Sequence, residues 1–188
     1  MKQERLYRWR RLQGAGLEVL RLEASGDGVR ARGEIIDAGS ETFAASYDWQ
    51  LDASWRTRTL RLQLRGADIR DLTIERAGAA QWNVDGGTRP DLLGCEEIDL
   101  SATPFCNTLA LRRFGPPPGA AGEMTALYIG FPRLALSPSR QRYEQIGPNE
   151  FVYIDLGLYA GFRARITVDP DGLIKTYEGL FERIEEEE

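Results

Sequence analysis

The stretch DLSATPFCNTLALRRFGPPPG, Asp99 to Gly119, decides the fold because it predicts one short helix in a chain of strands. Thr103 is a good N-cap residue, and Pro104 after it suits the first helical position. Gly115 suits the position after the last turn, and the prolines that follow prevent the helix from continuing. The start and stop signals therefore agree on a helix over about 103–114.

Most of the surface of this helix is apolar. At 100° per residue, most of its circumference is covered by Phe105, Cys106, Leu109, Ala110, Leu111 and Phe114. Thr108 and Arg112 form the remaining polar stripe, and Asn107 falls on a buried side, where it needs hydrogen-bond partners. A helix that is apolar almost all round is a buried helix. We therefore expect it to lie in the core, with a sheet curved around it.

The rest of the chain alternates apolar and polar residues with a period of two, as strands do. In GFRARITVDPDG, residues 161–172, a strand pattern ends in DPDG, which supplies a turn. One face of this strand carries Phe162, Ala164, Ile166 and Val168. Roughly a dozen or more such segments follow one another at the spacing typical of all-β folds. The sequence thus predicts a mainly β protein in which a long antiparallel sheet encloses a single helix.

Composition and charge argue against several classes of function. The chain has 188 residues and a net charge of -5, so we expect one domain over 1–188 and no nucleic-acid binding, which needs a basic field. No segment resembles a signal peptide or a membrane span, so we expect a cytoplasmic protein without stable membrane insertion. Cys95 and Cys106 should be free thiols, and we expect neither a metal nor another cofactor. The acidic tail, residues 185–188, should be disordered.

The chain has no histidine, which excludes Ser–His and Cys–His nucleophile pairs. An enzyme would therefore have to use other groups, and CEEIDL places the carboxylates of Glu97 and Asp99 on one side of a strand. These two residues, with Glu96 beside them, are the ones to test for a carboxylate-based hydrolase acting on a glycoconjugate. Like charges in such positions pair with arginine or water more often than they catalyse.

Five segments resemble, in the same order and over nearly the whole chain, a bacterial family described as putative glycolipid-binding proteins, formerly a domain of unknown function. DLSATPFCNTLALRRF, residues 99–114, resembles the signature segment of the family. Residues 16–36 resemble its N-terminal hairpin, and residues 47–62 its central strands. Residues 131–153 and 168–184 resemble its C-terminal part.

The resemblance implies a spiral β-roll, in which a long antiparallel sheet winds around one helix, and a homodimer. This architecture is similar to that of bacterial carriers of lipoproteins, which hold acyl chains in an apolar cavity. The sequence departs from the family at Ala110, where the family usually has proline. Alanine at this position favours a longer and more regular helix.

The first functional hypothesis is a non-catalytic binding protein for a glycolipid or other amphiphile, held in an apolar groove between sheet and helix. The apolar part of the ligand would lie against Phe105, Leu109 and Phe114. The polar head would meet side chains at the rim, drawn from Trp55, Arg56, Arg58, Asn107, Arg112, Arg113, Tyr128 and Tyr143. The alternatives are the hydrolase and a dimeric interaction module that binds no small ligand.

Overall fold

The computed structural model describes residues 3–114 and 120–185. Within these residues, fifteen strands form one sheet that accompanies one α-helix and one short 3-10 helix. The first strands are β1 (Gln3–Arg11), β2 (Gly16–Ser25), β3 (Gly28–Asp37), β4 (Phe43–Leu51), β5 (Thr57–Arg65), β6 (Ile69–Gly78), β7 (Gln81–Val84) and β8 (Gly87–Thr88). The later elements are η1 (Pro90–Leu92), β9 (Glu97–Leu100), α1 (Phe105–Phe114), β10 (Ala121–Gly130), β11 (Ala135–Gly147), β12 (Glu150–Asp155), β13 (Arg163–Val168), β14 (Ile174–Tyr177) and β15 (Phe181–Arg183).

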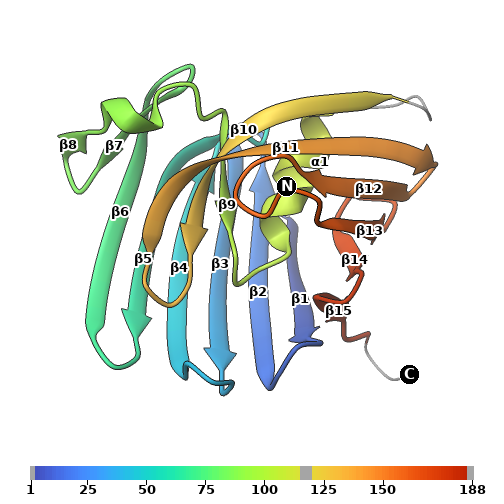
Figure 1. The fold of residues 1–188 in the computed structure, drawn as a ribbon, viewed down its shortest axis with the longest axis horizontal. Coiled ribbons are helices and arrows are strands. Elements are labelled where there is room, and N and C mark those ends of the chain that lie inside the picture. Colours follow the sequence, from blue (N-terminus) through green and yellow to red (C-terminus); the bar gives the residue numbers. More distant parts are fainter. Residues whose placement is uncertain (1–2, 115–119, 186–188) are drawn as a thin grey trace.

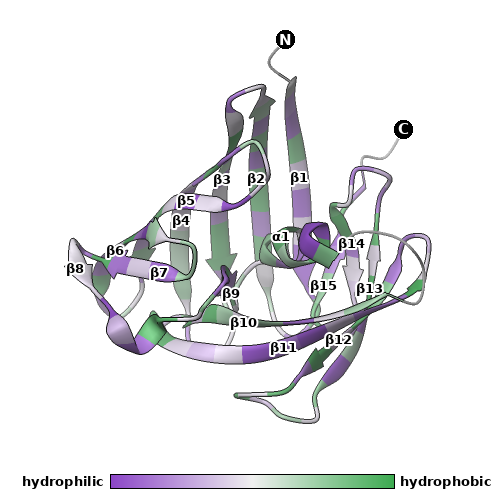
Figure 2. Ribbon diagram, turned by 90° about the horizontal axis from the view of Figure 1, so that it is seen from above, coloured by the Kyte–Doolittle hydropathy of each residue, from purple (hydrophilic) through white to green (hydrophobic). Residues whose placement is uncertain are grey.

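The sheet is a roll that curls around the helix. Its strand order is β8-β7-β6-β5-β4-β3-β2-β1-β15-β14-β13-β12-β11-β10-β9. The first and last strands of the chain, β1 and β15, pair in the interior of this order, with Trp9 opposite Arg183. Figures 1 and 2 show the curled sheet with α1 inside it from two directions. The predicted architecture, a long sheet coiled around a single central helix, is confirmed.

One strand pairing differs from the predicted antiparallel pattern. β9 and β10 run parallel, with Asp99 opposite Tyr128. Parallel neighbours cannot be joined by a tight turn and need a longer crossover connection, which is usually a helix. The helix α1 lies between β9 and β10 in the sequence and provides this crossover. The helix therefore fills the roll and also allows β9, the strand at the edge of the sheet, to run parallel to β10.

The helix is buried, as its sequence predicts. It begins at Phe105, two residues after the predicted start at Thr103. Phe105 is 0% exposed and Leu109 is 1% exposed. The predicted cap at Thr103 is present, because the backbone N–H of Phe105 donates to Thr103 Oγ1 at 3.1 Å. Asn107 has the partner that its buried position requires, since Tyr143 Oη donates to its Oδ1 at 3.0 Å.

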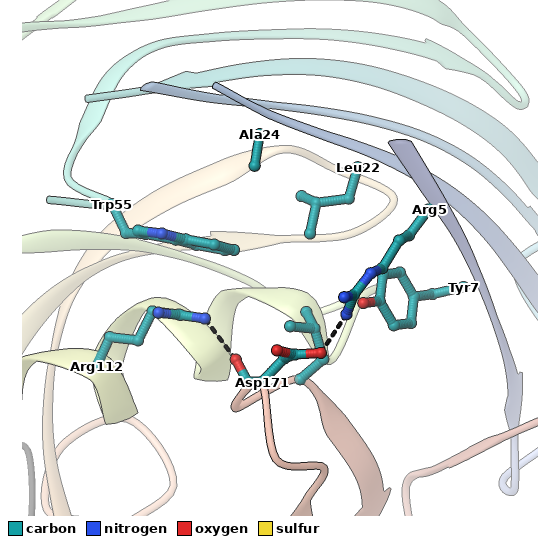
Figure 3. Close-up of a pocket in the computed structure, with 8 residues that line it drawn as sticks. Arg5, Tyr7, Leu22, Ala24, Trp55, Arg112 and Asp171 are labelled. Atoms are coloured by element: carbon teal, nitrogen blue, oxygen red, sulfur yellow. Dashed lines mark hydrogen bonds and ion pairs between the residues drawn. The ribbon is translucent and has the colours of Figure 1, made fainter. Parts of the chain in front are cut away.

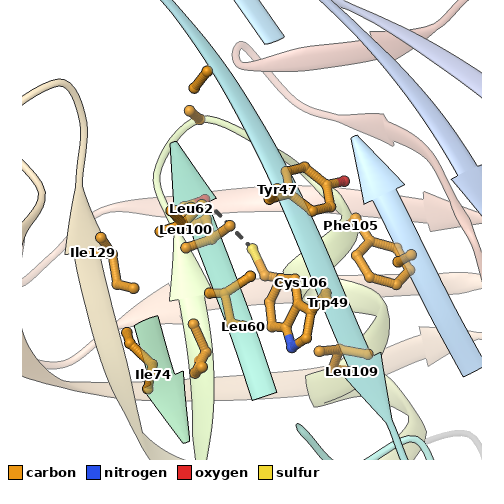
Figure 4. Packing of buried hydrophobic residues seen from close by; sticks show 14 of the residues in the cluster. Tyr47, Trp49, Leu60, Leu62, Ile74, Leu100, Phe105, Cys106, Leu109 and Ile129 are labelled. Carbon is orange, nitrogen blue, oxygen red and sulfur yellow. Dashed lines mark hydrogen bonds between the residues drawn. The ribbon is translucent and has the colours of Figure 1, made fainter. Parts of the chain in front are cut away.

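The core packs against the helix from both halves of the sheet. Phe105 and Leu109 lie among residues of β4 to β6, including Trp49, Leu60 and Ile74 (Figure 4). The Trp49 and Phe105 rings meet edge to face, with their centroids 5.7 Å apart. On the other side of the helix, Ala110 and Leu111 pack in a second group of buried residues with Met124, Ala126, Tyr143, Tyr153, Ala164, Ile166, Val168, Ile174, Tyr177 and Phe181.

A buried carboxyl group ties the start of the helix to β2 and β4. Tyr47 Oη and Thr103 Oγ1 both donate to Glu18 Oε1, at 2.6 and 2.8 Å. Within the described residues, Glu18 Oε2 has no hydrogen-bond partner. Burial raises the pKa of Glu18 to about 7, although the hydrogen bonds from Tyr47 and Thr103 lower it. Gly33 makes room for Tyr47, since a Cβ atom there would lie 2.1 Å from the Tyr47 ring.

Some predictions fall on residues outside the described ranges. The helix stop signals in residues 115–119 and most of the acidic tail, residues 186–188, lie there. Both predicted free cysteines are described, and both Cys95 and Cys106 are buried thiols. In the described part of the chain, no helix combines the length and apolarity needed to cross a membrane.

Candidate functional site

Two cavities lie at opposite ends of α1. The larger, about 500 Å³, is lined by Thr103 and Asn107 at the start of the helix. The smaller, about 90 Å³, is lined by Arg112 in the last turn of the helix. The antiparallel strands run between the same two ends: Arg11, at the end of β1, lines the larger cavity, and Arg5, near its start, lines the smaller one. We call these the tyrosine cavity and the Trp55 cavity.

The tyrosine cavity draws its wall from five parts of the chain that are separated in the sequence. The end of β1 with the turn after it, the segment from β9 into α1, and β12 with the loop that follows it all contribute, and so do the turn between β14 and β15 and Tyr128 of β10. Most of the wall is aromatic or aliphatic: Leu100, Tyr128, Tyr153, Tyr159, Phe162, Tyr177, Leu180 and Phe181. Its polar members are Arg11, Gln13, Asp99, Ser101, Thr103, Asn107 and Asp155. A concave wall that combines aromatic and aliphatic side chains with hydrogen-bonding groups is typical of a small-molecule site.

Asp99 projects from β9 and is one of two carboxylates in this wall. Its Oδ1 accepts a hydrogen bond from Cys106 Sγ at 3.0 Å, and its Oδ2 accepts one from Gln141 Nε2 at 2.5 Å. Burial raises the pKa of Asp99, the two hydrogen bonds lower it, and the charge of Asp155 raises it further. Each Asp99 oxygen keeps acceptor capacity for a ligand, because a carboxylate offers about four lone-pair sites.

Asp155, at the end of β12, is the second carboxylate and holds the loop that follows it. Its Oδ1 accepts hydrogen bonds from the backbone N–H groups of Gly157 and Tyr159, at 2.7 and 3.0 Å. Tyr153 Oη donates to its Oδ2 at 3.1 Å. This arrangement is an Asx turn, in which a side chain replaces a backbone acceptor. The loop thereby places Tyr159 and Phe162 at the cavity.

The tyrosines of the cavity form two pairs. Tyr128 and Tyr159 have ring centroids 6.0 Å apart and hydroxyl oxygens 3.4 Å apart. Tyr153 and Tyr177 have ring centroids 5.8 Å apart. Burial raises the pKa of the Tyr128, Tyr153 and Tyr177 hydroxyls, so these groups stay neutral. The O–H of Tyr153 already donates to Asp155. In the described part of the chain, the Tyr177 hydroxyl has no hydrogen-bond partner, although the residue is only 7% exposed.

A chain of hydrogen bonds behind the wall links α1 to Asp99. Tyr143 Oη donates to Asn107 Oδ1 at 3.0 Å and to Gln141 Oε1 at 3.2 Å, sharing its one hydrogen between them. Gln141 in turn donates to Asp99. Such a chain fixes the rotamer of each member, so Asp99 is held in position before any ligand arrives.

The Trp55 cavity is nearly filled by its own side chains (Figure 3). The guanidinium carbon of Arg112 lies 3.7 Å from the centroid of the Trp55 ring. Asp171 joins the two arginines of this cavity, since its backbone oxygen accepts from Arg112 and its carboxylate pairs with Arg5. Trp55 itself has a left-handed backbone, with φ of 62°. Asp52 supports this turn by accepting from the N–H groups of Ser54 and Arg56, at 2.8 and 3.0 Å.

The structure distributes the predicted site residues over several places. Tyr128 and Asn107 line the tyrosine cavity, and Tyr143 lies directly behind it. Trp55 and Arg112 meet in the Trp55 cavity. Arg58 lines a shallow surface hollow near the turn between β2 and β3. Arg56 is exposed.

Two of the predicted apolar contacts have a packing role instead. Phe105 and Leu109 are fully enclosed by the core and line neither the tyrosine cavity nor the Trp55 cavity. The reason is physical: side chains from both halves of the sheet reach the helix and fill the space that the predicted groove would need. Arg113 leaves the helix on the outer side and pairs with Glu96.

The two predicted carboxylates, Glu97 and Asp99, have different surroundings. Glu97 is 2% exposed, and its Oε2 accepts from Arg76 Nη2 and from the Thr57 N–H, both at 3.1 Å. Burial raises the pKa of Glu97, while the charge of Arg76 lowers it. Of these two carboxylates, only Asp99 lines the tyrosine cavity. In residues 3–114 and 120–185, no cluster of three or more Cys, Asp or Glu side chains is suited to hold a metal ion.

Sequence reasoning missed most of the aromatic wall. Tyr153 and Asp155 share one face of β12, and Tyr159 and Phe162 follow in the next loop. Tyr177 and Phe181 flank the last turn. The density of aromatic residues in YIDLGLYAGF, residues 153–162, was a usable signal. Nothing in the sequence shows that this loop meets the start of the helix.

The chain matches one family over most of its length. The match covers residues 6–183, and the family is described as "Putative glycolipid-binding". The chain is also similar to a protein of the DUF1089 family from Pseudomonas aeruginosa, whose crystal structure superposes with a TM-score of 0.79 at 31% sequence identity. That similarity covers 90% of this chain and 92% of the other. No curated protein matches. The protein therefore belongs to the family described as putative glycolipid-binding proteins.

Proposed function

We propose that the protein binds a glycolipid or another amphiphile, with the polar head of the ligand in the tyrosine cavity. The observation that carries this proposal is a cavity of about 500 Å³ that combines aromatic rings with hydrogen-bonding groups. Pockets for small ligands measure about 300–1,000 Å³ and have this kind of wall. The free acceptor sites of Asp99 and the Tyr177 hydroxyl suit a head group that both donates and accepts hydrogen bonds.

A second hollow supports a place for the apolar tail. This hollow, about 350 Å³, shares Tyr128 and Tyr159 with the tyrosine cavity and adds Phe131 and Leu158. We call it the Leu158 hollow. Leu158 is 45% exposed and Phe162 is 37% exposed, so both offer apolar surface beside the two tyrosines. An alkyl chain that covers these side chains removes their surface from water, at about 25 cal/mol per Å².

This location differs from the groove that the sequence suggests. The ligand lies at the end of the roll where the helix starts, and not along the helix, because Phe105 and Leu109 are already enclosed. The other end of the roll is a poor alternative. The Trp55 cavity measures only about 90 Å³, below the size of a usual ligand pocket.

The test has two parts. Native mass spectrometry of the full chain, purified without denaturation, should detect a bound amphiphile, and lipid extraction should release it. Isothermal titration with decyl glucoside should then give a saturable heat. Phe162→Ala should weaken this binding by about tenfold, equivalent to 1.4 kcal/mol of lost contact. Ile69→Ala is the matched control, because Ile69 is 79% exposed and lies away from the cavity.

The proposal fails if neither a co-purified amphiphile nor saturable binding of any alkyl probe is found. It also fails if Phe162→Ala and Ile69→Ala behave alike. The carboxylate-based hydrolase has less support, since Glu97 is committed to Arg76. The homodimer, the interaction module and the cytoplasmic location stay predictions.

A further inference from the structure

We infer that the head group held in the tyrosine cavity carries an ammonium group, as an amino sugar or an alkylammonium does. This inference rests on the proposed function, because it concerns the same cavity. The inference adds that the head group of the ligand carries a positive charge.

The first argument is an imbalance of charge in the wall. The protein pairs other buried carboxylates with arginine: Asp37 with Arg11 at 2.6 Å, Glu97 with Arg76 at 3.1 Å, and Glu23 with Arg32. Within the described residues, neither Asp99 nor Asp155 has an ion pair. Glu18 also lacks one, but it does not line the cavity.

Arg11, the cation in the wall of the cavity, does not neutralise Asp99 or Asp155. Arg11 lines the cavity, but its guanidinium is committed to Asp37. The wall therefore presents two carboxylates, and the one cation among its members is already neutralised by a residue outside it. Water is largely displaced from such a site once a ligand enters, which strengthens the attraction of the carboxylates for a cation and their repulsion of an anion.

The second argument is the kind of side chain that surrounds the two carboxylates. Aromatic faces carry partial negative charge and attract an ammonium group within about 6 Å of the ring. Tyr128 with Tyr159, and Tyr153 with Tyr177, place two pairs of rings in the wall, with centroids 6.0 and 5.8 Å apart. Proteins recognise quaternary ammonium ligands with aromatic side chains, and nearby carboxylates add charge attraction for any cation.

The third argument is the unsatisfied polar group. Tyr177 is 7% exposed, and in the described part of the chain its hydroxyl makes no hydrogen bond. Within the described residues, the fully enclosed side-chain atoms that lack a partner do not include this hydroxyl, so it is accessible from the cavity that Tyr177 lines. Its oxygen can accept a hydrogen bond from a primary ammonium group, and Asp99 can accept another. An anionic head group could accept from the Tyr177 hydroxyl, but it would place its oxygens against the carboxylates of Asp99 and Asp155, which only accept.

The test compares four amphiphiles with the same decyl chain, titrated into the full-length protein at pH 7 below their micelle concentrations. Decyl glucoside is neutral, and decyl glucosaminide replaces one hydroxyl of the same ring with an ammonium group. Decyltrimethylammonium carries a quaternary ammonium, and decyl sulfate is anionic. We expect at least one cationic probe to bind about tenfold or more tightly than the glucoside, and the sulfate to bind most weakly. Whichever cationic probe is tighter identifies an amino sugar or an alkylammonium.

Variants assign the preference to the cavity. Asp99→Asn keeps the shape and removes one charge, and it should reduce the preference for the cationic probe over the glucoside by about fivefold or more. Asp68→Asn is the matched control, because it removes the same charge from a side chain that is 71% exposed and outside the cavity. Tyr159→Leu, at a residue that is 59% exposed, tests the aromatic contribution without a buried change and should reduce the same ratio.

Each result separates the two proposals. If the glucoside binds as tightly as both cationic probes, the ammonium inference is wrong and the binding function stands. If the preference exists but survives both Asp99→Asn and Tyr159→Leu unchanged, the ammonium does not sit in this cavity. If none of the four probes binds, the proposed function itself fails.

Discussion

The buried carboxyl of Glu18 makes the stability of this protein depend on pH between about 4.5 and 7. Its folded-state pKa of about 7 stands well above the ordinary value of 4.5. Ionising Glu18 therefore costs the folded state about 3 kcal/mol more than it costs the unfolded chain. Below pH 4.5 both states are protonated and the cost is absent. The stability is lost as the pH rises from about 4.5 to 7, and the loss levels off above that range.

The perturbation that isolates this effect is Glu18→Gln. Glutamine keeps the shape of the side chain and an oxygen that accepts from Tyr47 and Thr103, but it cannot ionise. The free energy of unfolding of the Glu18→Gln variant, minus that of the original protein, should therefore grow by about 2–3 kcal/mol between pH 5 and pH 8. Urea unfolding, followed by the fluorescence of the buried residues Trp9 and Trp49, measures this difference at each pH.

Glu34→Gln serves as the control, since Glu34 is exposed on the outer face of β3. Its effect should stay within about 0.5 kcal/mol over the same pH range. A constant difference between Glu18→Gln and the original protein from pH 5 to pH 8 would refute the reasoning. It would mean that Glu18 ionises as easily in the folded state as in the unfolded chain.

Two further substitutions test the packing around the helix, and a third tests the buried ion pair of Arg76 with Glu97. Leu109→Ala should lower the free energy of unfolding by about 2–5 kcal/mol in urea melts, and a cost near zero would mean that the helix is not central. Gly122→Ala should cost about 1–3 kcal/mol, because its Cβ atom would lie 1.9 Å from the Phe114 ring; an unchanged urea midpoint would show that the ring is free to move away. Arg76→Met should cost about 3–5 kcal/mol by leaving Glu97 buried without its cation, and the additional change Glu97→Gln should recover much of that loss if the ion pair is the cause.

The two ends of the roll differ in how much space their side chains leave, and this difference indicates at which end a ligand would bind. At the end of the helix, Arg112 stacks on Trp55 and Asp171 binds both Arg112 and Arg5, so little space is left. At the start of the helix, aromatic side chains surround a much larger space. A ligand therefore enters beside Asp99 and the helix N-terminus in our proposal.

Local chemistry determined the helix. The cap at Thr103 depends only on residues next to it in the sequence. The burial of the helix follows from the apolar side chains on most of its faces, whichever strands surround it. The strands could also be predicted, because alternation reports which side of a strand faces a core. Asn107 is a good example: its position on an apolar helix required a buried partner, and the structure supplies Tyr143.

Only the tertiary structure decided the order of the strands and the site. The pairing of β1 with β15 and the parallel pairing of β9 with β10 join segments whose own patterns fit many partners. The tyrosine cavity likewise needs the turn after β1, the start of α1, the loop 156–162 and the turn before β15 to meet at one end of the roll. Alternation fixes the face on which a side chain lies, but the distance between two such faces depends on how the whole sheet curls.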